Sequence, residues 1–255
     1  MTIEEAIQLA ENGDIGAMIS LGDYYVQKNN ADGVENAYKW YAMAAKHKVV
    51  YAIHMALLTK KISAESSLLV ATQVEYGVSF AMDEWRELYE LASDELDCIT
   101  KGLPGSEDLK IEDTIANLKE ATYHYALCAY SLGDYTKACA LIADSDDIRS
   151  VILYGSCLIQ LADNAKEMAN AAMLFAPVIH NQEYVAAQKS ALEENAYRTA
   201  AIQLSRINKL VGDLETAVSI LTFMSNAVRR DNNKQAISEE LSHYQKKLFG
   251  GYKYV

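Results

Sequence analysis

Proline is scarce in this sequence, with only Pro104 and Pro177 among its 255 residues. A proline inside a helix costs roughly 3 kcal/mol, so its scarcity permits long, uninterrupted helices. Few segments alternate apolar and polar residues with the period of two that marks a half-buried strand. Hydrophobic residues make up 51% of the chain, which is ample for a core. These features predict an all-α protein.

Long apolar runs are also missing. None approaches the roughly 20 residues that a helix needs to span a bilayer, and the first residues lack the basic and apolar regions of a signal peptide. We therefore expect a cytoplasmic protein that makes no membrane contact. No Cys-x-x-Cys pair occurs, and the wide spacing of the cysteines within helical patterns favours buried free thiols over disulfides. The four cysteines are Cys98, Cys128, Cys139 and Cys157.

The motifs of common chemistries are absent as well. The sequence has no Walker sequence, no G-x-G-x-x-G loop and no Gly-x-Ser-x-Gly elbow. The five histidines are scattered along the chain, and no two of them lie at metal-ligand spacing. We interpret His54 as a hydrogen-bonded, partly buried imidazole rather than a ligand. The sequence predicts no catalytic residue, no cofactor and no metal, although a catalytic group assembled only in three dimensions stays open.

Basic residues are few in the first part of the chain. The formal net charge is -12; residues 1–115 hold nine Lys and Arg against twenty Asp and Glu. From Arg198 onward the balance is nine against five. This distribution argues against nucleic acid as the main partner. It permits a basic protein partner, or a homo-oligomer formed by contact between the acidic front and the basic tail.

The densest acidic stretch lies on a helix predicted over residues 80–100. Its apolar stripe includes Trp85 and Leu88, and seven acidic residues occur between Asp83 and Asp97. We interpret these acidic residues as a solvated helix face, with a patch for a basic ligand as the alternative. The glutamate pairs at 193–194 and 239–240 are likewise expected to face solvent.

Small and aromatic residues recur in a pattern of paired helices. Gly13-Asp14 predicts a turn, with glycine in the left-handed position and Asp14 capping the next helix. Ala10 and Ala45 are 35 residues apart, as are Ala17 and Ala52. The order Ala…Leu-Gly-x-x-Tyr, then Ala-x-x-Trp-Tyr-x-x-Ala-Ala, resembles the Sel1-like repeat, a relative of the tetratricopeptide repeat. The resemblance covers Gly13 to about Leu57, and the pattern breaks after Lys60.

The second half of the chain resembles tetratricopeptide repeats. Residues 123–135 hold Ala126 and the turn Gly133-Asp134, and a third candidate repeat has its turn at Gly212-Asp213 after a helix over 184–210. The resemblance implies a right-handed α-α superhelix, a solenoid of antiparallel helix pairs. We expect Sel1-like repeats plus the acidic helix over 1–101, a linker at 102–105, tetratricopeptide-like repeats with a capping helix over 106–249, and a flexible tail at 250–255. Ser106 is expected to cap the helix after the linker, the capping helix is expected over 234–248, and the fold of 60–80 stays open.

The resemblance also implies a function. In such proteins the first helix of each pair lines the concave face and contacts the ligand, which implies a non-catalytic scaffold for a protein or peptide. The positions that match are Ile19, Asp23 and Val26, then Tyr123, Leu127 and Tyr130, then Arg206 and Lys209. Packing between helices is the alternative for the tyrosines. A small-molecule sensor or all-α enzyme with a pocket between the two halves is the alternative function.

Overall fold

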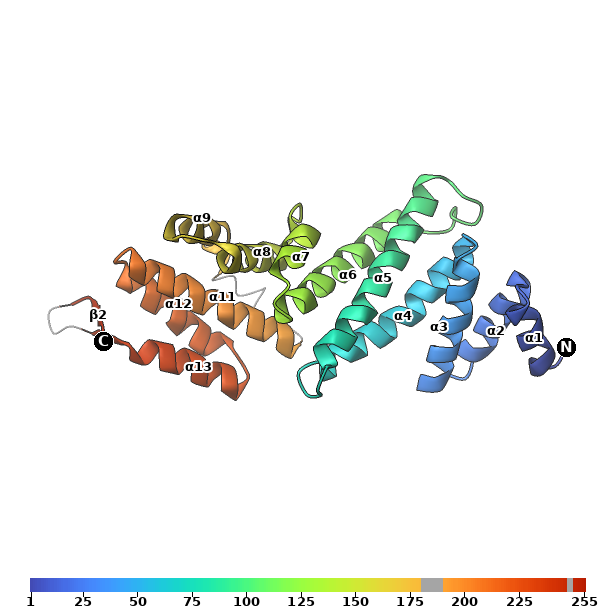
Figure 1. Ribbon diagram of the computed structural model, residues 1–255, viewed down its shortest axis with the longest axis horizontal. Coiled ribbons are helices and arrows are strands. Elements are labelled where there is room, and N and C mark those ends of the chain that lie inside the picture. Colours follow the sequence, from blue (N-terminus) through green and yellow to red (C-terminus); the bar gives the residue numbers. More distant parts are fainter. Residues whose placement is uncertain (180–189, 247–249) are drawn as a thin grey trace. The chain divides into compact units, whose positions relative to one another are not determined.

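The computed structural model describes residues 1–179, 190–246 and 250–255 (Figure 1). Twelve helices hold 75% of these described residues, so the predicted all-α class is confirmed. One short antiparallel strand pair is added near the C-terminus. None of the described helices combines the length and the hydropathy that crossing a membrane requires. The chain divides into two compact units, residues 1–124 and 125–255, which are described separately below.

The first unit is a series of helices in which each helix from α1 to α5 packs against the next one along the chain (Figure 1). Short turns join them, so neighbours run in opposite directions. A long helix, α6, begins in this unit and continues into the second. The helices are α1 (Ile3–Glu11), α2 (Ile15–Val26), α3 (Ala31–Ala45), α4 (Val50–Val70), α5 (Gly77–Thr100) and α6 (Ile111–Ser131).

Close approach between helices in this unit depends on small residues. A Cβ atom on Gly22 would lie 2.5 Å from the ring of Tyr41, so only glycine lets this ring of α3 lie against α2. Ala17 and Ala52, which are 35 residues apart in sequence, are both buried in one apolar cluster. The expected inward position of these small residues is therefore confirmed.

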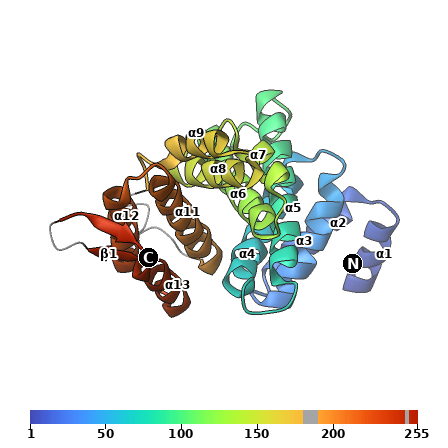
Figure 2. The ribbon, with the colours of Figure 1, turned by 60° about the vertical axis from the view of Figure 1, so that its left-hand side comes forward.

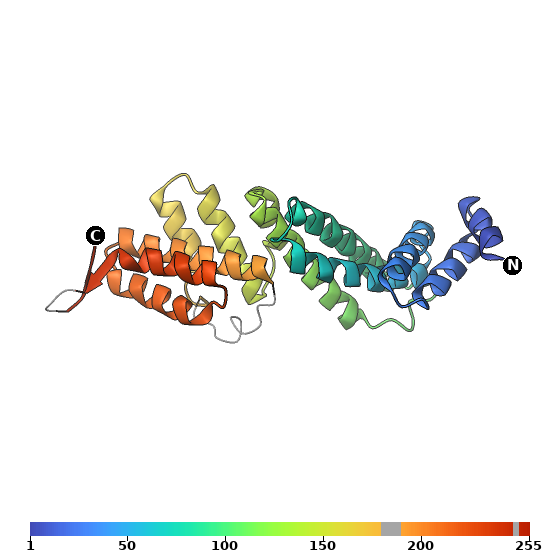
Figure 3. The same cartoon turned by 90° about the horizontal axis from the view of Figure 1, so that it is seen from below.

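The second unit holds the rest of α6 and two groups of helices. The core of the unit is formed around Phe175, Tyr197, Leu204 and Met224. Helices α11, α12 and α13 contact one another (orange to red in Figure 3), and the hairpin of β1 and β2 lies beside α12 and α13 (Figure 2). The elements are α7 (Tyr135–Ile142), α8 (Ile148–Leu161), α9 (Ala165–Phe175), α11 (Ala191–Leu210), α12 (Leu214–Ala227), α13 (Asp231–Ser242), β1 (Tyr244–Lys246) and β2 (Tyr252–Tyr254).

Three Gly-Asp turns begin helices α2, α7 and α12, as the sequence predicts. In each turn the glycine has a positive φ, which L side chains rarely adopt, and the aspartate accepts a hydrogen bond from the backbone N–H three residues later. The glycines are Gly13 (φ 95°), Gly133 (φ 84°) and Gly212 (φ 84°). The bonds are Ala17 N to Asp14 at 2.8 Å, Lys137 N to Asp134 at 3.1 Å and Thr216 N to Asp213 at 3.0 Å.

The fold of residues 60–80, which the sequence leaves open, is mostly helical: α4 continues without a break to Val70, past the point at which the repeat pattern ends, and α5 begins at Gly77. Two expected boundaries are wrong. Ser106 caps no helix; its hydroxyl donates to the Leu103 carbonyl, and α6 begins at Ile111. The predicted capping helix ends at Ser242, where a hairpin follows in place of a last helical turn.

Two further expectations fall partly outside the described residues. These are the beginning of the helix predicted from Tyr184 and the end of the capping helix at Leu248. Of the predicted tail, residues Tyr252–Tyr254 form β2. The division into compact units lies between His124 and Tyr125, within α6, whereas the predicted linker is a series of turns between α5 and α6.

Replacing Gly22 by alanine tests the close approach of α2 and α3. We expect Gly22→Ala to destabilise the first unit by about 1–3 kcal/mol, because the new methyl group overlaps a fully buried ring. Urea unfolding followed by tryptophan fluorescence measures this unit alone, since both tryptophans, Trp40 and Trp85, lie in it. Gly16→Ala in the same helix is the control and should change stability by less than about 1 kcal/mol, because its methyl group meets only the Asp14 carboxylate, at 3.3 Å. Equal effects of the two substitutions would contradict the interpretation.

Candidate functional site

Helix α4 carries a row of residues on its outer side that are apolar with one exception, Glu65. The residues are Tyr51, Met55, Leu58, Ile62, Glu65 and Leu69, hereafter the α4 row. Their spacings of four, three, four, three and four positions place them along one side of the helix in the heptad pattern of a coiled-coil seam. Met55 is half-buried and Glu65 is exposed. The other four remain 47%, 41%, 54% and 63% exposed, in chain order, which is unusual for large apolar side chains that follow one another on a helix.

Asp23 joins this row to α2 and α3. Its Oδ1 accepts hydrogen bonds from the hydroxyls of Tyr41 at 2.7 Å and Tyr51 at 2.8 Å. The two rings meet edge to face with centroids 6.3 Å apart. Burial and the hydrogen bond to Asp23 raise the pKa of Tyr41 and of Tyr51, so both hydroxyls stay protonated donors. The carboxylate therefore lies at one end of the α4 row, beside an exposed aromatic ring.

The inner side of α4 carries a buried cation instead of a continuous apolar surface. Lys60 Nζ lies 2.7 Å from Glu84 and 2.6 Å from Glu87, both on α5. The same ammonium lies 4.6 Å from the ring centroid of Tyr38 on α3, whose hydroxyl donates to Glu87 at 2.7 Å. Ser63 Oγ also donates to Glu84. Three helices are thus joined through one buried lysine.

The protonation of this cluster follows from its contacts. Burial alone would raise the pKa of Glu87, but hydrogen bonds from Lys60 and Tyr38 and the charge of Lys60 together hold this pKa below its usual value. Burial and the neighbouring carboxylate raise the pKa of Tyr38. The ion pair is therefore fully formed at neutral pH.

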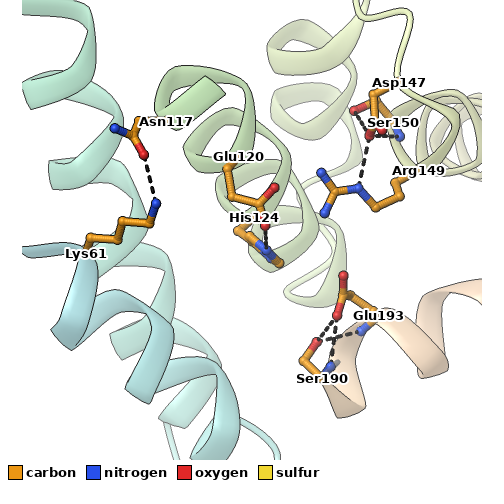
Figure 4. Close-up of polar contacts among 9 residues, drawn as sticks. All are labelled: Lys61, Asn117, Glu120, His124, Asp147, Arg149, Ser150, Ser190 and Glu193. Carbon is orange, nitrogen blue, oxygen red and sulfur yellow. Dashed lines mark hydrogen bonds and ion pairs between the residues drawn. The ribbon is translucent and has the colours of Figure 1, made fainter. Parts of the chain in front are cut away.

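Two further polar contacts join α4 to the neighbouring helices. His54 Nδ1 lies 2.7 Å from Glu95 of α5, and that carboxylate also accepts from Thr114 of α6 at 2.6 Å. Lys61 donates to Asn117 of α6 at 2.8 Å (Figure 4). The expectation of a hydrogen-bonded, partly buried His54 is confirmed. The interpretation of all acidic residues of α5 as a solvated face is wrong, because Glu84 and Glu95 are buried partners of α4.

A buried histidine lies on α6 in the same unit. His124 Nε2 pairs with Glu120 at 2.8 Å (Figure 4), and its ring lies 4.4 Å from that of Trp85, centroid to centroid. His124 Nδ1 and Trp85 Nε1 are both buried and make no hydrogen bond to the described part of the chain. These groups lie inside the unit and present no surface to a partner.

The predicted contact residues of α2 and α6 have different surroundings. Ile19 is half-buried against the apolar cluster of the first helices, Asp23 is bound by the two tyrosine hydroxyls, and Val26 is exposed. Their position on α2 is therefore compatible with contact. The residues of α6 were expected to be exposed, which is wrong: Tyr123, Leu127 and Tyr130 are buried. The two tyrosines therefore pack between helices, which was the alternative interpretation for them.

The two predicted cationic residues of α11 are already engaged by the C-terminal part of the chain. Arg206 pairs with Glu240 of α13 at 2.6 Å, and Lys209 Nζ lies 3.5 Å from the ring centroid of Tyr254 in β2. Hydrogen bonding to Glu240 raises the pKa of Arg206. A ligand would have to compete with Glu240 for Arg206 and with the ring of Tyr254 for Lys209.

Glutamates predicted to face solvent in the second unit are mostly buried, so that expectation is also wrong. Glu194 accepts from the side chains of Arg230 at 2.9 Å and Asn233 at 2.7 Å. These hydrogen bonds outweigh burial and lower its pKa. Glu193 forms a capping box with Ser190 (Figure 4). Glu194 therefore joins α11 to the beginning of α13, and Glu193 caps α11 itself.

An open groove lies between α8 and α9 in the second unit. Its volume is about 430 Å³, and Leu158, Leu161, Ala171 and Leu174 supply most of its wall. The only ionisable residue among its lining is Glu167, whose carboxylate already accepts from the backbone of Asp163 and the side chain of Asn164. This lining offers apolar contact but no converging polar groups of the kind that orient a small molecule.

The chain matches no known family and no curated protein sequence. The resemblance to Sel1-like and tetratricopeptide repeats therefore stays a prediction from the sequence. Within residues 1–179, 190–246 and 250–255, no three His, Cys, Asp or Glu side chains are grouped so that they could hold a metal ion. The α4 row with Asp23 is thus the candidate site with the most specific geometry. The α4 row was not predicted from the sequence, because the repeat pattern identifies only the residues that face inward. The alternating spacing of four and three positions is nevertheless present in the sequence.

Substituting Lys60 tests whether the buried cation fixes α4. We expect Lys60→Met to lower the free energy of unfolding of the first unit by about 3 kcal/mol at pH 7, because two carboxylates lose their counter-charge. The folded-state pKa of Glu87 is lowered, so its stabilising contribution is complete above its unfolded pKa of about 4.3 and is lost as pH falls through the folded value. The difference between Lys60→Met and the wild type should therefore shrink at about pH 3.5. Urea unfolding followed by tryptophan fluorescence at both pH values measures it.

A second lysine that pairs with α5 provides the control. Lys48 pairs with Asp94 of α5 at 2.7 Å, but both side chains are about half-exposed. Lys48→Met should cost less than about 1 kcal/mol at either pH, since solvent screens exposed ion pairs. If Lys60→Met were no more destabilising than Lys48→Met, the buried cluster would not fix α4.

Proposed function

We propose that the protein is a non-catalytic scaffold that binds another protein through the α4 row. The observation that carries this proposal is the exposure of large apolar side chains along one side of a helix that is already packed on its other sides. A helix that is apolar around its circumference is normally buried around its circumference. The outer side of α4 lacks such cover, and a partner protein would supply it.

The energetics of the row favour a protein over a small ligand. Full burial of a leucine or isoleucine side chain contributes roughly 1.5–3 kcal/mol. Leu58, Ile62 and Leu69 follow one another over about 16 Å of helix, a length that suits an extended partner better than a compact molecule. Asp23 adds negative charge at the Tyr51 end of the row and Glu65 adds it between Ile62 and Leu69, which would orient a partner rather than bind it alone.

The wider proposals rest on the sequence together with the packing of consecutive helices. We interpret the helix pairs as Sel1-like and tetratricopeptide-like repeats that form a right-handed solenoid. We also place the protein in the cytoplasm, where thiols stay reduced. All four cysteines are unpaired, and burial raises the pKa of Cys128 to about 12, so it remains a protonated thiol.

Affinity capture from the native cells tests the proposed function. The tagged wild-type chain should retain a partner that Leu58→Gln with Ile62→Gln fails to retain, because the polar side chains remove the apolar contact without adding charge. Val74→Gln with Phe80→Gln is the matched control: these residues are 56% and 55% exposed but lie outside the α4 row. The control should retain the partner. Capture that is absent for the wild type, or equal for both double variants, contradicts the proposal.

A further inference from the structure

The α4 row has the geometry of one half of a coiled coil. Coiled-coil helices meet along residues spaced alternately three and four positions apart, and the row follows this spacing over its whole length from Tyr51 to Leu69. The 21 residues of α4 correspond to three heptads. A surface that binds loops or small ligands has no need of this regularity, whereas an approaching helix requires it.

One position in the row is charged. Glu65 occupies a seam position with apolar residues before and after it, and it is exposed. A carboxylate that becomes buried between two helices needs a counter-charge, since an unpaired buried charge is strongly unfavourable. The residue that faces Glu65 in a bound helix must therefore be a lysine or arginine. In coiled coils a single polar seam position of this kind fixes the register of the partner.

A second anionic position lies about 21 Å from Glu65 along the helix, at Tyr51, where the ring packs beside Asp23. Only Oδ1 of Asp23 is used by the two tyrosine hydroxyls, so Oδ2 can accept from a cation that lies on the exposed ring of Tyr51. The first unit as a whole is also negatively charged: residues 1–124 hold ten Lys and Arg against twenty-one Asp and Glu.

We infer that the partner is a basic amphipathic helix that pairs with α4 along the row and places a lysine or arginine opposite Glu65. This inference rests on the proposed function and names the chemistry of the partner. A second copy of the chain fits less well. It would set each Glu65 against an apolar residue of the other row or against the other Glu65, between two surfaces of the same negative sign.

Synthetic three-heptad peptides of about 21 residues test the inference on the full-length protein. The basic peptide has leucine or isoleucine at the seam positions, one lysine in the seam, and lysines beside it. The acidic peptide is identical except that glutamate replaces each lysine. Like charges keep each peptide from pairing with itself. Fluorescence anisotropy of the labelled peptides should show that the basic peptide binds at least about tenfold more tightly than the acidic one.

Charge reversal in the protein separates pairing at the row from general attraction. Glu65→Lys should weaken binding of the basic peptide about tenfold. A peptide whose seam lysine is replaced by glutamate should bind this variant more tightly than the basic peptide does, which recovers part of the lost affinity. Glu75→Lys makes the same change of net charge outside α4 and should have less than about a twofold effect. Equal effects of Glu65→Lys and Glu75→Lys, or equal binding of the two peptides, would overturn the inference.

Two outcomes distinguish this inference from the proposed function. If affinity capture depends on Leu58 and Ile62 but no basic peptide binds, the scaffold function stands and the partner chemistry is wrong. If sedimentation shows a wild-type dimer that Leu58→Gln with Ile62→Gln converts to a monomer, the occupant is a second copy and the inference is overturned.

Discussion

The rotation of α4 about its own axis depends on Lys60. Apolar contact is not directional, so a helix that is apolar around its circumference could pack against its neighbours in several rotations. Ion pairs and hydrogen bonds are directional, and Lys60 makes two ion pairs below 3 Å to α5 while its ammonium lies over an aromatic ring of α3. Only one rotation of α4 satisfies these contacts. In that rotation the row from Tyr51 to Leu69 faces outward.

This cluster determines orientation more than it adds stability. A buried ion pair is often no more stabilising than apolar residues of similar volume, because removing two charges from water offsets their attraction. The other polar contacts from α4 to neighbouring helices are made in the same rotation of α4 that the Lys60 ion pairs require. His54 reaches α5, Lys61 reaches α6 and Tyr51 reaches α2, each at a distance that a turn of the helix would break.

The features predicted correctly from the sequence are those that depend on residues close together in the chain. A Gly-Asp turn involves four or five residues, and the inward position of Ala17 follows from the periodicity of a single helix. The buried glutamates escaped prediction because their partners are distant: Lys60 and Glu84 are 24 residues apart, His54 and Glu95 are 41 apart, and Arg230 and Glu194 are 36 apart. A carboxylate on a predicted helix is assigned to solvent unless such a partner is known. The same limit explains the error at Tyr123 and Tyr130, since a repeat pattern identifies the helix but not what covers each of its sides.

The outer side of α4 departs from the usual arrangement of a surface helix, whose solvent side is polar, while its inner side is buried and mostly apolar around Lys60. This division of the helix into two sides separates folding from binding. The inner side reaches its full set of contacts within the first unit, so folding of the unit does not require a partner. The outer side keeps the free energy that burial of the remaining exposed half of Leu58, Ile62 and Leu69 would release, about 1 kcal/mol for each side chain, for an event that occurs after folding. A partner can therefore associate and leave without unfolding the helix that binds it, which is the behaviour that a docking surface on a folded scaffold requires.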